Sequence, residues 1–235
     1  MTQLLYLTDC YMKEFDAVVQ EANGSSVVLD RTAFYPEGGG QPSDTGSMSA
    51  HGTQYKVASV KKIAGAVVHQ LDHSGLAAGD TVHCTIDWER RYRLMRYHTA
   101  THLVSAVFHK ETGALITGNQ LDVDRTRIDL SLENFDRAKI EECVRIANRH
   151  LARNLAVTTS FLPREEALKI PGMVKLATAL PPQVTELRIV QIGDVDTQAD
   201  GGSHVSNTSE VGEIELVSME NKGKNNRRIY FRLRE

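Results

Sequence analysis

The stretch that we expect to organise the chain is Arg96-Tyr97-His98-Thr99-Ala100-Thr101-His102. It lies in a segment without proline, from about Glu89 to Thr112, whose apolar residues and following Gly113 predict a helix that ends at a glycine cap. On such a helix the imidazoles of His98 and His102 lie one turn apart on one face, where both can bind a single metal ion. Histidines at this spacing also occur on half-buried helix faces for packing alone, so the pair indicates a site only if further ligands exist.

Composition limits the class of protein before any motif does. The chain has 235 residues, of which 41% are hydrophobic, enough for one large or two modest globular domains. Its net charge of -3 excludes a globally basic nucleic-acid-binding protein, so a polyanion must bind to local patches. The three scattered cysteines indicate buried thiols in a reducing compartment. With no basic leader and no apolar run of bilayer length, we expect a soluble, cytoplasmic protein.

The first third of the chain has the pattern of β-structure. Short β-branched or alternating runs are separated by turn-forming pairs such as Asn23-Gly24 and Gly79-Asp80. Five or six such strands predict a small barrel, in which Cys84 points inward as a small hydrophobic residue. The expected strands are Phe15 to Val19, Ser26 to Leu29, Tyr55 to Val60, Ala66 to Leu71 and Thr81 to Asp87.

A glycine-rich loop interrupts this region between Thr32 and Gly46. The consecutive Gly38, Gly39 and Gly40 permit positive φ and let backbone amides approach a ligand, while Thr32 and Gln41 offer hydrogen bonds. Composition alone favours the simpler interpretation, a hairpin connection. The loop is not a phosphate loop of the known kind, because no Lys-Ser or Lys-Thr follows the glycines.

The remaining chain is expected to alternate helices and strands. Four arginines lie just before the two histidines and suit either phosphate binding or the solvated first turns of the helix. We expect a strand pair near Leu115 to Leu132 with Gly118-Asn119-Gln120 between its two apolar runs, and a helix from an Asn134 cap to about Asn154 that buries Cys143. The later elements are a short helix from Pro163 that ends at Ile170-Pro171-Gly172, a loop at Pro181-Pro182 and a strand from Glu186 to Ile192.

A second chemical stretch runs from Gly193 to Val205. Here Asp200 and His204 lie four positions apart around Gly201-Gly202, a turn that lets both side chains converge. Together with His98 and His102 they complete a possible set of four metal ligands.

Taken together, these motifs resemble the editing domain of alanyl-tRNA synthetases and its free-standing relatives, the AlaX trans-editing proteins. The resemblance rests on the His-x-x-x-His pair and the later Gly-Gly-Ser-His-Val-Ser-Asn-Thr-Ser-Glu-Val-Gly. The glycine-rich loop resembles the segment that marks the medium-length AlaX form, and the basic tail Asn225 to Ile229 closes the domain as in that family. The resemblance therefore covers nearly the whole chain.

The resemblance implies an α+β protein. Its fold is an N-terminal small β-barrel over residues 1–88, followed by an α/β editing domain over residues 89–235 with a metal site between a helix and a sheet. One departure concerns Asp200, which stands where the family usually has a cysteine. A carboxylate is an accepted zinc ligand, so the implied set for one zinc ion is His98, His102, Asp200 and His204, and the three histidines alone could hold it. The family also places a glutamine near Gly118-Asn119-Gln120, in an ambiguous register.

The implied activity is hydrolysis of the ester that joins serine or glycine to tRNA(Ala), without ATP. A metal can activate water or instead hold the amino acid, and the sequence does not choose between these roles. Sparing alanine requires a site that hydrogen-bonds the serine hydroxyl. We assign this catalytic and selective role to Thr101, with Thr32 and Gln41, and substrate binding to Gly38, Gly39 and Gly40.

The tRNA is expected to bind to two clusters of cations, and its binding should weaken with salt. Two alternatives remain open: a tRNA-binding module that lost catalysis through Asp200, or a metal-dependent hydrolase of another small ester. The choice between serine and glycine and between monomer and dimer also stays open. The expected tRNA-binding residues are Arg90, Arg91, Arg93, Arg96, Lys222, Lys224, Arg227 and Arg228.

Overall fold

The computed structural model describes residues 2–134, 136–170 and 184–234. The chain divides into two compact units, Met1–Leu94 and Met95–Glu235. Helix α1 (Trp88–Thr112) contributes its first turns to one unit and the rest to the other. The expected domain boundary between residues 88 and 89 stays a prediction.

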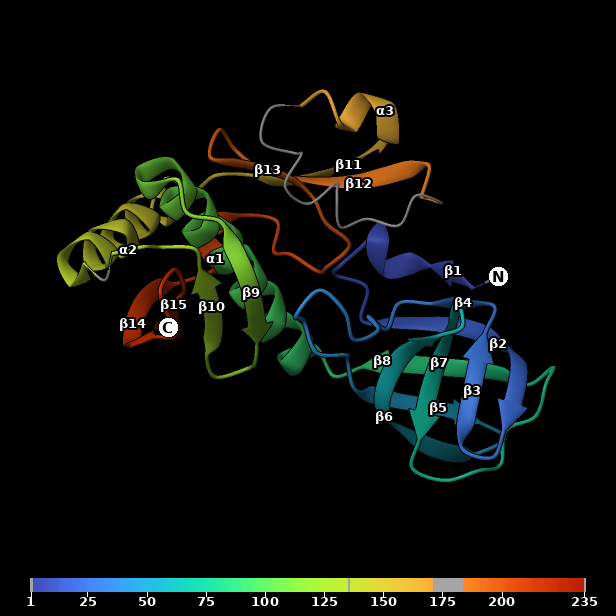
Figure 1. Cartoon of the computed structure of the whole chain (residues 1–235). Helices are drawn as coiled ribbons and strands as arrows, with labels where there is room; N and C mark the ends of the chain where they lie inside the picture. Colours follow the sequence, from blue (N-terminus) through green and yellow to red (C-terminus); the bar gives the residue numbers. More distant parts are fainter. Residues whose placement is uncertain (1, 135, 171–183, 235) are drawn as a thin grey trace. The chain divides into compact units, whose positions relative to one another are not determined.

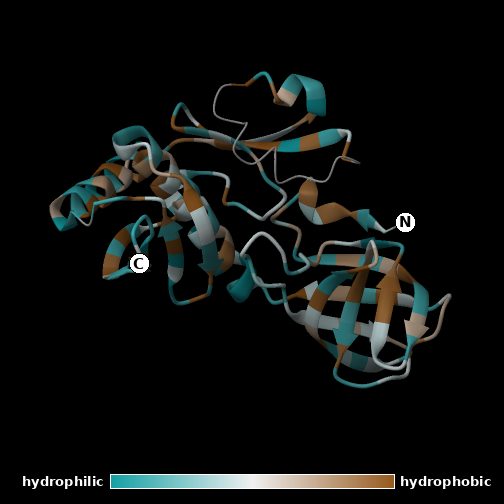
Figure 2. Cartoon of the chain, in the orientation of Figure 1, coloured by the Kyte–Doolittle hydropathy of each residue, from teal (hydrophilic) through white to brown (hydrophobic). Residues whose placement is uncertain are grey.

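A closed six-stranded barrel forms the first unit (Figure 1) and confirms the barrel expected from the sequence. Side chains alternate between its interior and solvent: in β8, Val82, Cys84 and Ile86 are buried while Thr81 and His83 are exposed. Figure 2 shows hydrophobic and hydrophilic residues following one another along the barrel strands. In barrel order the strands are β2 (Glu14–Asn23), β3 (Ser26–Leu29), β7 (Ala66–Leu71), β6 (Thr53–Ile63), β5 (Gly46–Ala50) and β8 (Thr81–Ile86).

Short elements flank the barrel. Strand β1 (Gln3–Leu4) pairs in parallel with β4 (Arg31–Thr32), and a 3-10 turn, η1, covers Leu5–Leu7. The glycine-rich loop follows β4. Its tip is a tight turn in which Gly38 and Gln41 exchange backbone hydrogen bonds of 3.1 and 2.9 Å. Gly39 and Gly40 have φ of +60° and +84°, so this turn requires glycine at both central positions.

Helix α1 is the central element of the second unit. All eight residues from Tyr97 to Val104 are buried, so two full turns are enclosed on every side. Gly113, at φ +71°, ends the helix through a hydrogen bond from its N–H to the carbonyl oxygen of His109, as the sequence predicts. A buried helix that carries His98, Thr99, Thr101 and His102 must supply partners for four polar side chains.

Two sheets and two shorter helices complete this unit (Figure 1). Ile140, Cys143, Val144, Ala147 and Leu151 form the buried stripe of α2, and Figure 2 shows hydrophilic residues alternating with it. The first sheet has the order β14 (Glu213–Asn221), β15 (Arg227–Arg234), β10 (Thr126–Leu130) and β9 (Ile116–Leu121). The second has the order β11 (Val157–Pro163), β12 (Glu186–Ile192) and β13 (Asp196–Ala199); the helical elements are α2 (Arg137–Leu151), α3 (Arg164–Ala167) and the 3-10 turn η2 (Thr208–Glu210).

Two local predictions were wrong. Gly118-Asn119-Gln120 is not a turn but part of β9, because Gly118 lies opposite Asp129 of β10 and a Cβ there would come within 3.2 Å of the Asp129 carboxylate. The chain turns instead at residues 122–125, where Asp122 N–H donates to the Arg125 carbonyl.

The second error concerns α2. Its N-cap is Asp136, whose carboxylate accepts from Lys139 N–H at 3.1 Å, so the helix begins later than an Asn134 cap requires. It also ends earlier, at Leu151, and Asn154 beyond it adopts a left-handed φ of +54°. The expected break at Pro171-Gly172 and the Pro181-Pro182 loop lie outside the described residues.

No helix among the described residues is both long and apolar enough to cross a lipid bilayer.

Candidate metal centre

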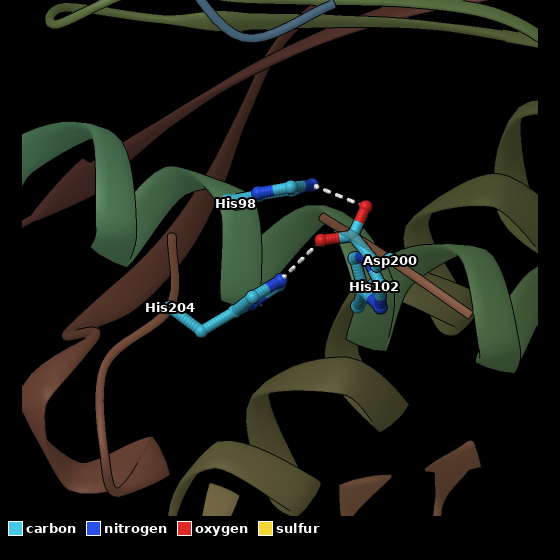
Figure 3. A group of neighbouring side chains, drawn as sticks. All are labelled: His98, His102, Asp200 and His204. Carbon is cyan, nitrogen blue, oxygen red and sulfur yellow. Dashed lines mark hydrogen bonds and ion pairs between the residues drawn. The ribbon is translucent and has the colours of Figure 1, made fainter. Parts of the chain in front are cut away.

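Four side chains of the second unit converge on one point, and they are the four expected from the sequence. His98, His102, Asp200 and His204 each offer one ligand atom, and these atoms lie within 4.8 Å of one another. In Figure 3 the imidazoles of His98 and His204 approach the Asp200 carboxylate from different sides, with Nε2 at 3.7 Å from Oδ1 and at 3.1 Å from Oδ2. The side chains of the three histidines are at most 8% exposed and that of Asp200 is 20% exposed, so the group is secluded from bulk water.

Helix α1 and the turn that follows β13 each supply two of the four side chains. His98 and His102 belong to consecutive turns of α1, and their ring centroids are 5.0 Å apart. Asp200 directly follows β13, and its Oδ2 accepts a 2.6 Å hydrogen bond from Gly202 N–H. This bond bends the chain back at Gly202, so that His204 faces the same carboxylate. The predicted metal site between a helix and a sheet is therefore present as a set of side chains.

Two residues that the sequence did not indicate orient the histidines. Asp196 of β13 accepts a 2.9 Å hydrogen bond from His102 Nδ1 and is itself held by the Gln198 amide at 2.9 and 3.0 Å. Thr99 Oγ1 lies 3.1 Å from His204 Nδ1. Partners of this kind fix the ring and leave Nε2 for a metal, as in protein zinc sites. Asp196 stands in the quoted stretch from Gly193 to Val205, but its pairing with His102 depends on where β13 lies.

Burial sets the protonation state of the ligands. Desolvation lowers the pKa of His98 to about 4, and lowers that of His204 well below its ordinary value. Burial alone would lower the pKa of His102 too, but the hydrogen bond and charge of Asp196 raise it above the ordinary value. Burial opposes ionisation of Asp200, yet the charges of the neighbouring histidines bring the pKa of its carboxyl well below normal. At neutral pH the site therefore presents a carboxylate and at least two neutral imidazoles.

The donor set fits a divalent metal. Three imidazole nitrogens and one carboxylate oxygen are ordinary zinc ligands. Ligand atoms about 2.0–2.2 Å from a tetrahedral zinc ion are roughly 3.4 Å apart, so side-chain adjustments of about one ångström close this set around an ion. The four residues can hold a metal ion, and their orienting partners are already in place.

Thr101 lies on the same helix between the two histidines. It is 2% exposed, and its hydroxyl donates a 2.8 Å hydrogen bond to the Tyr97 carbonyl one turn earlier. Since its only proton is used in this way, Thr101 can take part in recognition only as a hydrogen-bond acceptor.

The glycine-rich loop belongs to the first unit, and both Thr32 and Gln41 are buried there. Thr32 is fully buried, with Oγ1 2.8 Å from His69 Nε2 and 3.1 Å from Phe34 N. Gln41 is 1% exposed, whereas Gly38 and Gly39 are exposed at the tip of the turn. The exposed backbone of the tip is available to a ligand, but the Thr32 hydroxyl is not.

The predicted tRNA-binding cations differ in their surroundings. Arg91 is fully buried and donates to Asp44, Cys10 and Ala33; Arg227 is 4% exposed and donates to several carbonyl oxygens, including that of Glu133. Neither guanidinium can reach a phosphate without leaving these partners. The partners of Arg96 and Arg228 include the Val211 carbonyl and Asp129. The more exposed cations are Arg93, Lys222 and Lys224, with Arg90 half-buried.

Comparison with known proteins relates both units to translation enzymes. Residues 3–90 match the family described as tRNA synthetases class II (A), and residues 187–230 match the threonyl and alanyl tRNA synthetase second additional domain.

Relatives of similar length match almost end to end. The alanyl-tRNA editing protein AlaX-M of Methanosarcina barkeri is 48% identical over 241 residues, which cover 99% of each chain. The protein of the same name from Saccharolobus solfataricus is 46% identical over 234 residues, 98% of each chain. The alanine–tRNA ligase of Thermococcus kodakarensis is 39% identical over 98% of this chain, which spans 25% of the ligase.

Proposed function

This chain belongs to the family of AlaX-M alanyl-tRNA editing proteins, and from that membership we propose that it hydrolyses the ester bond of mischarged tRNA(Ala) in trans. The observation that carries the proposal is the convergence of His98, His102, Asp200 and His204, whose imidazole and carboxylate donors suit a zinc ion. We propose that the metal is one zinc ion, that the mischarged amino acid is serine or glycine, and that the protein acts in the cytoplasm.

The chain's own residues divide the chemical work. When bound, a zinc ion supplies positive charge that stabilises negative charge on the ester carbonyl. Asp196 and Thr99 keep the rings of His102 and His204 turned toward the common centre. The low exposure of the three histidines keeps bulk water away, which strengthens every electrostatic contact with the substrate.

Discrimination against alanine is assigned to Thr101. Its hydroxyl oxygen is fixed by the bond to Tyr97 O and can accept a hydrogen bond from the serine hydroxyl, which alanine lacks. The other predicted participants, Thr32, Gln41 and the three glycines, are proposed to act through the loop that they form. The buried Thr32 and Gln41 keep the loop in shape, and the exposed backbone of Gly38 and Gly39, together with the half-buried Gly40, meets the substrate.

The tRNA is proposed to contact the partly exposed cations Arg90, Arg93, Lys222 and Lys224. Such contacts release counterions, so binding should weaken steeply with salt. Charge reversal at Lys222 and Lys224 together should lower tRNA affinity without affecting metal content. Unchanged affinity would remove this pair from the interface.

The deciding experiment measures release of serine from seryl-tRNA(Ala) by the purified protein, with alanyl-tRNA(Ala) in parallel and a chelator control. Chelator-sensitive release of serine but not alanine is expected. Tight tRNA binding without release would instead favour a non-catalytic tRNA-binding module. Release that a chelator does not affect would contradict the metal-dependent mechanism.

A further inference from the structure

Arg188 of β12 lies against the turn that carries two of the four candidate ligands. It is 7% exposed. Its Nη1 donates hydrogen bonds of 2.9 Å to the carbonyl oxygens of both Asp200 and Gly202, and its own carbonyl accepts from Asp200 N–H at 3.0 Å. One side chain therefore bonds the turn at two points, and the backbone of the same residue holds it at a third.

These bonds act on the geometry of the ligands rather than on the ligand atoms. The carbonyl oxygens of Asp200 and Gly202 lie at the two ends of the turn. Holding both ends fixes the direction of the Asp200 side chain and the path of the backbone toward His204. The Asp200 carboxylate bonds Gly202 N–H from the other side of the same turn. The turn is thus fixed by a guanidinium on its carbonyl side and by a ligand carboxylate on its amide side.

We propose that Arg188 is a positioning residue for the metal centre, which preorganises Asp200 and His204 so that both meet His98 and His102 at one point. The inference rests on the proposed metal site and adds to it a residue that touches neither metal nor substrate. A planar guanidinium presents several donors in a fixed arrangement, whereas a lysine ammonium is a point charge on a flexible stem. Arg188→Lys therefore keeps the charge and loses the fixed geometry.

The chain offers a matched control in Arg227 of β15. It is also buried, at 4% exposed, lies in the same unit and donates to the carbonyl oxygens of Gly223, Asn226 and Glu133. It therefore does the same structural work on a turn that carries no ligand. If Arg188 only stabilises the fold, Arg188→Lys and Arg227→Lys should have the same effect on metal binding.

The test measures zinc affinity by competition with a chromophoric chelator, and the visible absorption of the cobalt-loaded proteins. We expect Arg188→Lys to lower zinc affinity by 10- to 100-fold and to change the cobalt spectrum, as for other residues that orient ligands. Arg227→Lys should leave the zinc affinity and the cobalt spectrum unchanged. Urea unfolding of the metal-free proteins should show that the two variants lose comparable amounts of stability. Equal zinc affinity in wild type and Arg188→Lys would overturn the inference.

Two further outcomes are decisive. A wild-type protein that binds no zinc or cobalt would overturn the metal site itself, and the inference with it, which separates that failure from a failure of Arg188 alone. If Arg188→Lys does not fold, Arg188→Gln, which can still donate one hydrogen bond, takes its place. If neither variant folds while Arg227→Lys does, Arg188 serves the fold as a whole and the positioning role is wrong.

Discussion

The Nδ1 atom of His102 donates a 2.9 Å hydrogen bond to Oδ2 of Asp196, and both side chains are 8% exposed. This bond selects the tautomer of His102 that leaves Nε2 free for a metal. We predict that Asp196→Asn lowers metal affinity by about 10- to 100-fold. Competition with a chelator measures the effect, and Asp194→Asn, at an exposed aspartate two positions earlier, is the matched control. Affinity equal to wild type in Asp196→Asn would mean that Asp196 does not orient the ligand.

The affinity of the site for metal should also depend on pH. The pKa of His102 should set the pH at which this affinity begins to fall. A metal binds the neutral imidazole, so the affinity is greatest above the pKa of a ligand and decreases as the pH falls below it. Because Asp196 raises the pKa of His102 above its ordinary value, we expect the apparent dissociation constant to rise about tenfold per pH unit below that raised pKa. His98, with a pKa of about 4, should add a second proton only in strong acid. Metal titrations at successive pH values test this. In Asp196→Asn the affinity should begin to fall at a lower pH than in wild type.

Thr101→Val tests the basis of substrate selection. Valine keeps the shape of the threonine side chain but has no oxygen to accept the serine hydroxyl. We expect the ratio of seryl-tRNA(Ala) to alanyl-tRNA(Ala) hydrolysis to fall at least about tenfold. Thr112→Val is the control, because Thr112 makes the same bond to a carbonyl one turn earlier, that of Phe108, in the last turn of α1. If both variants keep the wild-type ratio, Thr101 has no role in selection.

The buried pair of Arg91 and Asp44 predicts a large effect on stability. Both side chains are 0% exposed, and the Arg91 Nε lies 2.9 and 3.0 Å from the two carboxylate oxygens. Asp44→Asn leaves the guanidinium charge buried without its counter-charge, which should cost about 3–5 kcal/mol of unfolding free energy. Glu141→Gln, which breaks the exposed pair with Arg137, should cost less than about 1 kcal/mol. Urea unfolding of both variants gives the comparison, and similar losses would contradict the assignment.

His69 should make the stability of the barrel sensitive to acid. Burial lowers its pKa to about 4, and the neutral ring accommodates a bond from Nδ1 to the Val27 carbonyl and one from the Thr32 hydroxyl to Nε2. Between the ordinary pKa of 6.5 and about 4 the unfolded chain binds a proton that the folded barrel does not. Stability contributed by His69 is therefore present above pH 6.5 and decreases by about 3 kcal/mol as the pH falls to 4.

The measurement for His69 is unfolding free energy at several pH values in wild type and in His69→Gln. Glutamine can replace both hydrogen bonds without titrating, so the variant should lose less stability between pH 6.5 and 4. Parallel pH profiles in the two proteins would show that another group is responsible.

Much of the fold and of the ligand set could be predicted from local patterns. Alternation of apolar residues specified β3 and β7 to the residue, and helical spacing placed His98 and His102 on one face. What local patterns cannot give is the partner supplied by tertiary structure. The sequence pattern around Arg91 is that of a solvated helix face, but in the structure Arg91 is buried and paired with Asp44, 47 positions earlier. A glycine at position 118 suggests a turn, but Gly118 lies in β9, where the absence of a side chain leaves room for Asp129. The pairing of Asp196 with His102, 94 positions apart, likewise depends on the folded chain.

The composition of the candidate centre has a consequence for oxidative conditions. Within the described part of the chain, the four converging ligands include no sulfur, because a carboxylate occupies the fourth position. Cys84 and Cys143 are buried, and desolvation raises the pKa of both thiols, which keeps them in the unreactive protonated form. Peroxide and thiol-alkylating reagents therefore find no thiol among the candidate ligands, and we expect metal binding here to survive treatment that would oxidise a cysteine ligand and release its metal.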